Sequence, residues 1–196
     1  MLLLRHGLIK ANVARRWHGS TDSPLTWRGR RQAKRTGRHL RRHHELTAVY
    51  SSPLQRCQRT AYFASRHQDL EIQSVDGLKE MSIGEWEDMP FRDLVDRHDF
   101  INRMTADIHH AAPAGECLAQ VSERVTAALR EIDAQHSEDE TVLVVSHGVA
   151  LAVALATLLD NNPARWIDYQ FHNCSLTDFE LTPAPVVHTY NEYMHL

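Results

Sequence analysis

Residues 1–7 read Met-Leu-Leu-Leu-Arg-His-Gly, and this stretch decides the fold. A run of four apolar residues that ends in Arg-His-Gly predicts a strand buried on both faces, because the run is too short for a helix. Arg5 and His6 then lie at the carboxyl end of that strand, where open α/β sheets place their ligands. Arginine binds phosphate well and a neutral histidine is a nucleophile, so the pair suggests chemistry on a phosphoryl group. The alternative is a strand that runs into an ordinary glycine turn.

A second stretch repeats this arrangement much later in the chain. Residues 141–145 are predicted to form another buried strand, and Ser146-His147-Gly148 follows it directly. If the two strands are neighbours in a parallel sheet, His6 and His147 face the same crevice. The repetition therefore favours a phosphoryl site over an accidental match.

The composition limits the classes of protein that need to be considered. The chain has 196 residues, 42% of them hydrophobic, and a net charge of −3, which fits one domain over residues 1–196 and argues against general nucleic-acid binding. No apolar run is long enough for a membrane span or a signal peptide. Cys57, Cys117 and Cys174 match neither a disulfide nor a metal-ligand pattern, which suits the cytoplasm. We expect no cofactor and no metal site.

Alternating strands and helices predict the fold class. Strands are expected at residues 1–4, 46–50, 71–75, 141–145, 174–181 and 186–190, and helices at 26–43, 53–66, 116–132 and 148–159. This order predicts an α/β three-layer sandwich, with a mostly parallel central sheet and helices on both faces. Residues 82–115 interrupt the alternation and are expected to form a lid-like excursion with one helix over 91–104.

Two further polar side chains are predicted near the same strand ends. Pro53 fits the first turn of a helix that carries Arg56, and helix starts favour anions, so Arg56 is a second candidate phosphate ligand. Asn12 lies in the loop after the first strand. It is either an amide donor to the same anion or a turn residue.

The predicted helix over 26–43 is strongly basic outside a narrow stripe formed by Ala33, Gly37 and Leu40. Such a helix either binds RNA or presents a solvated face. The solvated face is favoured, because aromatic stacking partners are not interleaved with the charges.

Taken together, the motifs resemble those of the histidine phosphatase superfamily, the phosphoglycerate mutase-like proteins, over nearly the whole length. The matching motifs, in chain order, are Arg5-His6-Gly7 with Asn12, Gly19 with Asp22 and Pro24-Leu25-Thr26, Ser51–Arg56 with Thr60-Ala61, Leu78–Glu80 with Gly84–Glu87, Pro113–Glu116, and Val145–Gly148. Several motifs in the right order are far more specific than any one of them.

The resemblance implies a role for each candidate residue. His6 is implied as the nucleophile that becomes phosphohistidine, and Glu80 as the proton donor to the leaving alcohol. Arg5, Asn12, Arg56 and His147 are implied to surround the phosphate. On the residues alone, Glu80 could equally be a surface carboxylate. The implied function is a metal-independent phosphomonoesterase of the cytoplasm that acts on a small phosphorylated metabolite.

Some positions differ from the family pattern and bear on the substrate. Leu8 and Ile9 stand where many members carry polar residues, and Val149 and Ala152 follow His147 where polar or basic residues often occur. These changes predict a more apolar pocket and weaken a mutase interpretation. A mutase-like phosphotransferase, an α-ribazole phosphatase-like enzyme and a non-catalytic phosphate-binding module stay open as alternatives. The sequence names neither the substrate nor the oligomeric state.

Overall fold

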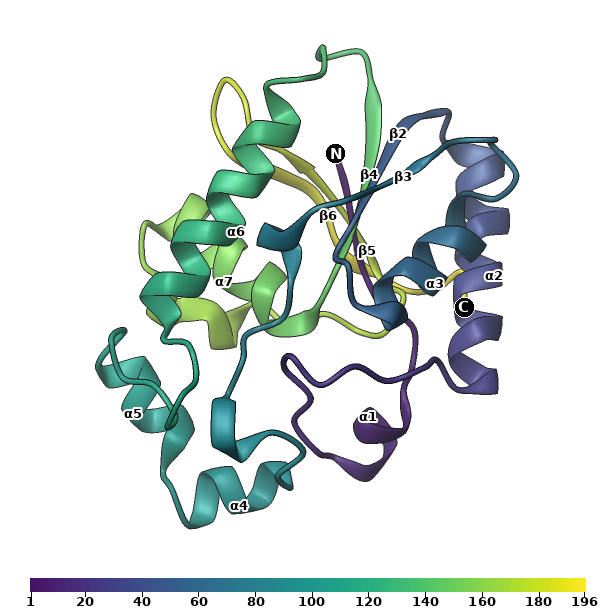
Figure 1. The fold of residues 1–196 in the computed structure, drawn as a ribbon. Coiled ribbons are helices and arrows are strands. Elements are labelled where there is room, and N and C mark those ends of the chain that lie inside the picture. Colours follow the sequence, from purple (N-terminus) through teal and green to yellow (C-terminus); the bar gives the residue numbers. More distant parts are fainter.

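The computed structural model describes residues 1–196 and has a six-stranded sheet at its centre (Figure 1). The strands are β1 (Leu2–Arg5), β2 (Leu46–Ser51), β3 (Ile72–Ser74), β4 (Thr141–Ser146), β5 (Leu176–Glu180) and β6 (Val186–Glu192). They lie in the order β3-β2-β4-β1-β5-β6. The first four strands in that order are parallel, and β5 and β6 run antiparallel to their neighbours.

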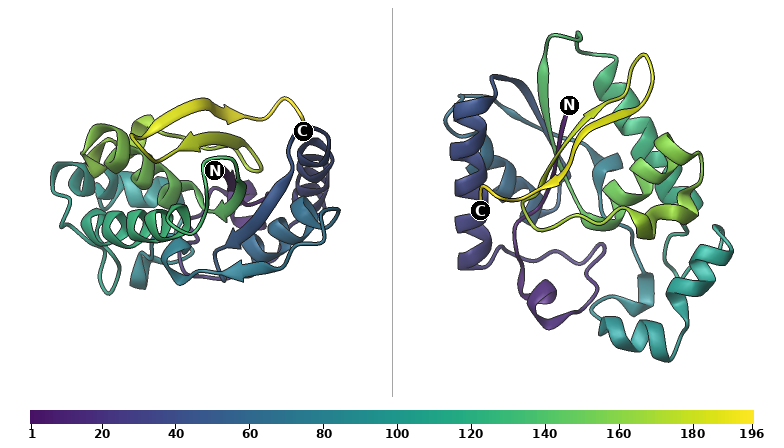
Figure 2. Two further views of the ribbon diagram at one scale, coloured as in Figure 1. Left: turned by 90° about the horizontal axis from the view of Figure 1, so that it is seen from above. Right: turned by 180° about the vertical axis from the view of Figure 1, so that it is seen from behind.

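Helices cover both faces of the sheet, as the three-layer prediction requires. One face carries α2 (Trp27–His43) and α3 (Gln55–Ser65), and the other carries α6 (Leu118–Asp133) and α7 (Gly148–Asp160), which Figure 2 shows from above. In β1, Leu2 and Leu4 pack into one apolar cluster while Leu3 packs into the other. Burial on both faces explains why the strand is apolar throughout.

The starts of the helices depend on side chains from neighbouring loops. The Thr26 hydroxyl accepts a hydrogen bond from the Gly29 N–H, 3.0 Å away, which caps α2 as the sequence suggests. Asp22 caps α3 from a distance, since its carboxylate accepts the Gln55 N–H at 3.0 Å. The longest apolar-faced helix starts at Leu118 rather than at Glu116, because Glu116 is engaged elsewhere.

The prediction of a single helix over 91–104 is wrong. The structure has two short helices, α4 (Phe91–Asp96) and α5 (Phe100–Ala106), and Asp99 between them adopts a left-handed conformation with φ of 48°. A left-handed residue cannot continue an α-helix, so the chain turns there. Both helices lie beyond the carboxyl ends of β1 and β4, at the lower end of Figure 1.

Several short elements were not predicted at all. These are α1 (Lys10–Ala14) and three 3₁₀ segments, namely η1 (Asp76–Leu78), η2 (Gly84–Trp86) and η3 (Pro163–Asp168).

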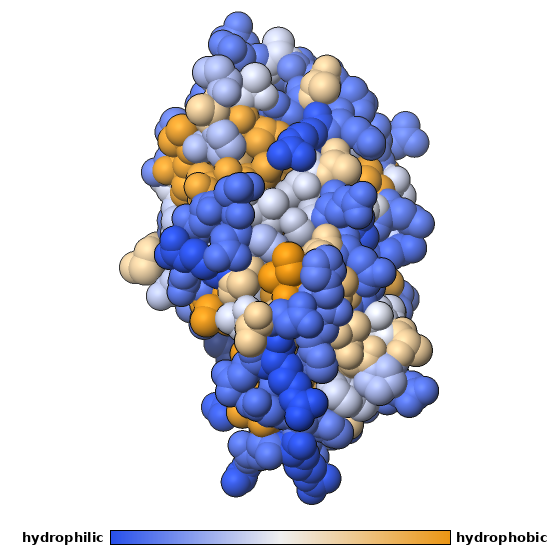
Figure 3. Space-filling view, turned by 90° about the vertical axis from the view of Figure 1, so that its left-hand side faces the viewer, coloured by the Kyte–Doolittle hydropathy of each residue, from blue (hydrophilic) through white to orange (hydrophobic).

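The face that carries α5, α6 and α7 is mostly hydrophilic, with apolar residues gathered in limited patches (Figure 3). None of the helices combines the length and the apolar character that a membrane crossing needs.

Candidate functional site

The pairing of β1 with β4 brings the two predicted histidines together. Arg5 lies opposite Ser146 in the parallel register, and the His6 N–H donates to the Ser146 carbonyl at 3.0 Å. The imidazole rings of His6 and His147 are 5.2 Å apart between centroids and inclined by 63°. The expectation that the two strands are neighbours is confirmed.

His6 is buried and is held in one tautomer. Its Nδ1 lies 2.8 Å from the Gly7 carbonyl oxygen, and because that oxygen can only accept, Nδ1 carries the hydrogen. Burial lowers the pKa of His6 well below its ordinary value, and the charges of Arg56 and Arg5 lower it further. The ring is therefore neutral near pH 7, with a lone pair on Nε2.

His147 holds its hydrogen on the opposite ring nitrogen. Its Nδ1 accepts from Arg56 Nε at 3.1 Å, and its Nε2–H donates to the Ser52 hydroxyl at 2.8 Å. Burial, followed by the charges of Arg56, His6 and Arg5, lowers the pKa of His147 well below its ordinary value. His147 is thus neutral and can act as a hydrogen-bond donor through Nε2.

Arg56 is completely buried, and its remaining donors bind a single loop. They reach the carbonyl oxygens of His18, Gly19 and Thr21 at 3.3, 2.6 and 2.7 Å. The sequence predicts that Arg56 lies close to the end of the preceding strand. In the structure it lies there, in contact with His147. Arg56 also fixes both the loop and His147, which the sequence did not indicate.

Arg5 lies across the start of α7. One guanidinium nitrogen donates to the Phe171 carbonyl, and Nε is buried without a hydrogen-bond partner. The guanidinium packs on Gly148, where a Cβ would come within 3.2 Å of it. Burial lowers the pKa of Arg5, while Glu80 acts in the opposite direction. A half-buried cation with an unpaired donor at the edge of the cavity is suited to an anionic ligand.

Glu80 lies at the amino terminus of α7. Its carboxylate accepts the N–H groups of Met81, Val149 and Ala150 at 3.0, 3.1 and 2.9 Å. Glu80 is 8% exposed, so it is not the surface carboxylate that the residues alone left open. These three backbone donors fix the carboxylate at the edge of the cavity that His6 also lines.

Asn12 is oriented by Asn173, a residue outside the predicted set. The Asn12 carbonyl oxygen accepts the Ile9 N–H at 3.3 Å and the Asn173 side-chain N–H at 3.2 Å. The same Asn173 nitrogen is 3.0 Å from the His6 carbonyl oxygen. Because its oxygen is occupied, Asn12 has only its NH₂ group left to offer a ligand.

A partly buried ion pair that the sequence analysis did not single out supports the segment that carries Glu80. Arg124 binds Glu116 through two nitrogens, at 2.7 and 2.9 Å. The same guanidinium donates to the carbonyl oxygens of Gly77, Lys79 and Glu80. Glu116 in turn accepts the Ser82 N–H at 2.8 Å. The motif that contains Glu116 was visible in the sequence, but its partner on α6 was not.

A second carboxylate ties the segment after Glu80 to the loop that holds Arg56. Glu87 accepts the N–H groups of Gly19, Ser20 and Thr21, each at 3.0 Å. Gly19 fits only without a side chain, since a Cβ there would lie 2.0 Å from the Met81 carbonyl oxygen. Loop and segment therefore form one assembly around Arg56.

The candidate residues open onto a cavity of about 780 Å³. Its polar wall contains Arg5, His6, Asn12 and Glu80, whereas Arg56 and His147 have no exposed surface and lie behind it. Its apolar wall contains all four positions predicted to be apolar, Leu8, Ile9, Val149 and Ala152, together with Phe91 and Ile101 from α4 and α5 and Trp166, Tyr169 and Phe171. The four apolar positions thus line the cavity as expected, but Arg15, Arg16 and His18 line it as well.

One group of potential metal ligands lies elsewhere. His39, Glu192 and His195 present their ligand atoms within 4.8 Å of one another. They share no residue with the cavity of His6. The arginines 35, 38 and 42 line the same small hollow as His39 and His195, and their charge disfavours a cation there.

The sequence can also be compared with known proteins. The family described as the histidine phosphatase superfamily (branch 1) matches residues 1–192. Phosphoserine phosphatase 1 of Hydrogenobacter thermophilus is 31% identical over 177 residues, which cover 89% of this chain and 83% of that protein. The probable phosphoglycerate mutase GpmB of Citrobacter koseri is 32% identical over 204 residues, which cover 99% and 93%.

The fold agrees with a solved structure of similar size. Mycobacterial glucosyl-3-phosphoglycerate phosphatase in complex with VO3 is 26% identical and matches with a TM-score of 0.87 over 97% of this chain and 98% of that chain. The match to the family covers almost every residue, and the predicted motif residues converge on one cavity. The chain therefore belongs to branch 1 of the histidine phosphatase superfamily.

Proposed function

We propose that the protein is a metal-independent phosphomonoesterase that hydrolyses a small organic phosphate through a phosphohistidine at His6. The observation that carries the proposal is the state of His6. Its Nδ1–H is bound to the Gly7 carbonyl oxygen and its pKa is lowered by burial, so Nε2 keeps a lone pair. A nucleophile that is neutral and fixed in orientation is what in-line attack on phosphorus needs.

In the first step, His6 Nε2 forms a bond to phosphorus and the bond from phosphorus to the ester oxygen breaks. The leaving oxygen takes a proton from Glu80, because an alkoxide leaves poorly without one. Arg5 Nε and the Asn12 NH₂ group are donors for the phosphoryl oxygens, and His147 offers its Nε2–H once that hydrogen leaves Ser52. Arg5 and Asn12 lie at the cavity before the reaction begins, which is the most effective form of electrostatic stabilisation, whereas His147 has to exchange its bond to Ser52 for one to the phosphoryl group.

In the second step, water attacks the phosphohistidine. Glu80, now ionised, accepts the proton of the water, the bond between phosphorus and Nε2 breaks, and inorganic phosphate forms. His6 returns to its neutral form with its hydrogen still on Nδ1. The three backbone N–H groups that bind Glu80 hold its carboxylate in one place for both steps.

The cavity supports a substrate class. Leu8, Ile9, Val149 and Ala152 line the cavity beside apolar rings, so part of the organic group of the ester is apolar or aromatic, while Arg15 and Arg16 on the same cavity suit a polar part. Residues 82–115 serve as the lid over it, since Phe91 and Ile101 reach the cavity. Phosphoserine phosphatase and glucosyl-3-phosphoglycerate phosphatase among the relatives support hydrolysis of a small phosphorylated metabolite. Three buried free cysteines fit a cytoplasmic protein.

A phosphoglycerate mutase is the second candidate, because the relative from Citrobacter koseri carries that name. A mutase has to return the phosphoryl group to its substrate and keep water out. Leu8 and Ile9 cannot themselves hold a second substrate phosphate, and this favours the hydrolase. Free phosphate and isomerised product, measured in the same reaction with 3-phosphoglycerate, separate the two functions.

The decisive experiment measures phosphate release from a panel of phosphomonoesters, with EDTA present, for the parent chain and His6→Ala. We expect release in EDTA that His6→Ala abolishes, together with an acid-labile phosphoenzyme that only the parent forms. Activity that EDTA removes would contradict the metal-independent mechanism. Activity that survives in His6→Ala would show that another residue is the nucleophile.

A further inference from the structure

Five arginines form a stripe along one face of α2. Arg28, Arg31, Arg35, Arg38 and Arg42 follow one another at intervals of three or four residues, so they lie on one side of the helix. None of them forms a salt bridge, and α2 contains no acidic residue. Like charges at these intervals destabilise a helix by about 0.2–0.5 kcal/mol per pair. Helix stability therefore does not account for the stripe, whereas a bound polyanion would relieve the repulsion.

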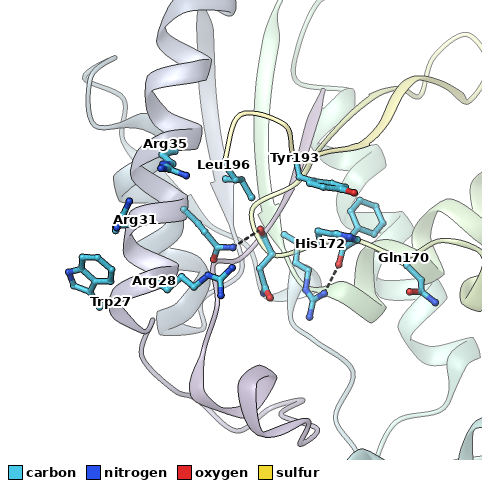
Figure 4. Close-up of a pocket in the computed structure, with 12 residues that line it drawn as sticks. Trp27, Arg28, Arg31, Arg35, Gln170, His172, Tyr193 and Leu196 are labelled. Carbon is cyan, nitrogen blue, oxygen red and sulfur yellow. Dashed lines mark hydrogen bonds between the residues drawn. The ribbon is translucent and has the colours of Figure 1, made fainter.

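The stripe forms one wall of a groove. A cavity of about 950 Å³ lies between Arg28, Arg31 and Arg35 on one side and residues 170–173, Tyr193 and Leu196 on the other. Figure 4 shows α2 with its arginines on one side and His172 and Tyr193 facing it. A smaller hollow of about 280 Å³ shares Arg35 and continues to Arg42. The larger volume lies within the usual range of small-molecule sites, about 300–1,000 Å³.

The opposite wall supplies an aromatic surface. The Tyr193 ring stacks on His172, with 4.3 Å between centroids and 16° between planes. Tyr193 is 45% exposed, so the stacked pair presents ring surface to the groove. Within α2, the Arg31 guanidinium lies 4.8 Å from the centre of the Trp27 ring, and the fold brings a second aromatic residue, Tyr193, to the same groove. Phosphate ligands and a stacking platform are thus combined in one groove.

We propose that this groove binds a nucleoside polyphosphate. Its phosphates lie against Arg28, Arg31 and Arg35, whose planar guanidinium groups match phosphate oxygens, and its base stacks on Tyr193. The groove is separate from the phosphoryl-transfer site, since neither His6 nor Glu80 lines it. Arg5 and Asn173 line both cavities, so the nucleotide and the phosphate ester lie on two sides of a shared wall.

The test is calorimetric titration of the full chain with ATP, adenosine and inorganic tripolyphosphate, in EDTA at fixed ionic strength. The His6→Ala background prevents turnover. We expect ATP to bind with one site per chain, more tightly than either of the other two. Arg28→Ala/Arg35→Ala should weaken ATP binding by about tenfold or more, because charge-assisted hydrogen bonds are worth about 1.5–3 kcal/mol each. Tyr193→Ala should weaken binding of ATP but not of tripolyphosphate.

Arg30→Ala/Arg41→Ala is the matched control, since it removes the same charge from the same helix on the side away from the stripe. Neither pair of arginines makes a side-chain contact whose loss would unfold the protein, which circular dichroism can verify. Equal weakening by both double variants would reduce the effect to net charge and overturn the proposal. Loss of ATP binding in excess orthovanadate would also overturn the proposal, because the nucleotide would then occupy the phosphoryl site. Tight binding of an oligoribonucleotide without ATP binding would assign the groove to nucleic acid instead.

Discussion

Arg56 donates its Nε hydrogen to Nδ1 of His147 at 3.1 Å, and this bond sets the chemistry of the second histidine. Since Nδ1 accepts, the single hydrogen of the neutral ring stays on Nε2. The Gly7 carbonyl oxygen has the opposite effect on His6, where it holds the hydrogen on Nδ1. The two rings therefore present different nitrogens, a lone pair on His6 and an N–H on His147. One can attack phosphorus while the other donates to a phosphoryl oxygen.

Arg56→Met should remove the hydrogen bond that fixes the tautomer of His147, with little change in side-chain volume. His147 then loses its fixed tautomer, and the carbonyl oxygens of His18, Gly19 and Thr21 lose their donors. We expect kcat to fall by about 10²–10³-fold, as for loss of one fixed donor at a reacting oxyanion, and the free energy of unfolding to fall by about 1–3 kcal/mol. Steady-state kinetics and urea denaturation measure the two effects.

Arg59→Met is the control for that variant, because Arg59 lies one turn further along α3. Arg59 is exposed and packs over Tyr62 and Phe63. Arg59→Met should therefore change kcat little. A comparable loss of kcat in both variants would mean that positive charge in general, rather than the bond to His147, is responsible.

Glu80→Gln separates the two functions of the carboxylate by the leaving group of the substrate. The amide cannot give a proton to a departing alkoxide, so we expect hydrolysis of an alkyl phosphate to fall by about 10²-fold or more. An ester with a good leaving group, such as 4-nitrophenyl phosphate, should lose much less in the phosphorylation step. Rapid-quench measurement of phosphoenzyme formation gives that step directly. A loss that is equal for both esters would exclude Glu80 as the acid.

Arg124→Met tests whether the ion pair to Glu116 positions Glu80. Arg124 binds the carbonyl oxygen of Glu80 and two carbonyl oxygens just before it, so its loss should displace the acid without removing it. We expect about a tenfold loss of kcat for the alkyl ester and a smaller loss for the 4-nitrophenyl ester. Arg130→Met, an exposed change on the same helix, should leave that difference unaffected. If Arg124 had a purely structural role, its loss would lower kcat equally for both esters.

The buried histidines should make stability depend on pH. Burial and the neighbouring arginines lower the pKa of His6 and of His147 below the ordinary value of 6.5. In the unfolded chain both rings bind protons as the pH falls below about 6.5, whereas the folded chain excludes them. The free energy of unfolding should therefore fall as the pH drops below about 6.5, by up to about 1.4 kcal/mol per pH unit for each histidine.

Urea denaturation between about pH 7 and pH 5 measures this slope, since the carboxylates titrate mainly at lower pH. His6→Gln removes one of the two groups and should make the slope shallower. The comparison cancels contributions from all other titratable groups. An unchanged slope in His6→Gln would show that His6 is protonated in the folded protein, and its role as nucleophile would then need another explanation.

The sequence was sufficient where a function depends on short-range pattern. The apolar runs before His6 and His147 predict both strands and the strand ends that bring the rings together. It was not sufficient where a contact depends on the packed fold. The left-handed turn at Asp99 splits a segment that has helical periodicity, and Asn173 approaches Asn12 only after the chain has returned to the sheet. The pairing of Arg124 with Glu116 likewise depends on the angle at which α6 leaves the lid segment.

The parallel pairing of β1 with β4 also affects how the protein is made. His6 is synthesised before the strand that completes its surroundings, which follows only after the lid segment and α6. Contacts between such distant parts of a chain carry a loop-closure cost and form slowly. The nascent protein therefore exposes an incomplete nucleophile site until β4 has been made, and phosphoryl transfer becomes possible only when the central strands have joined.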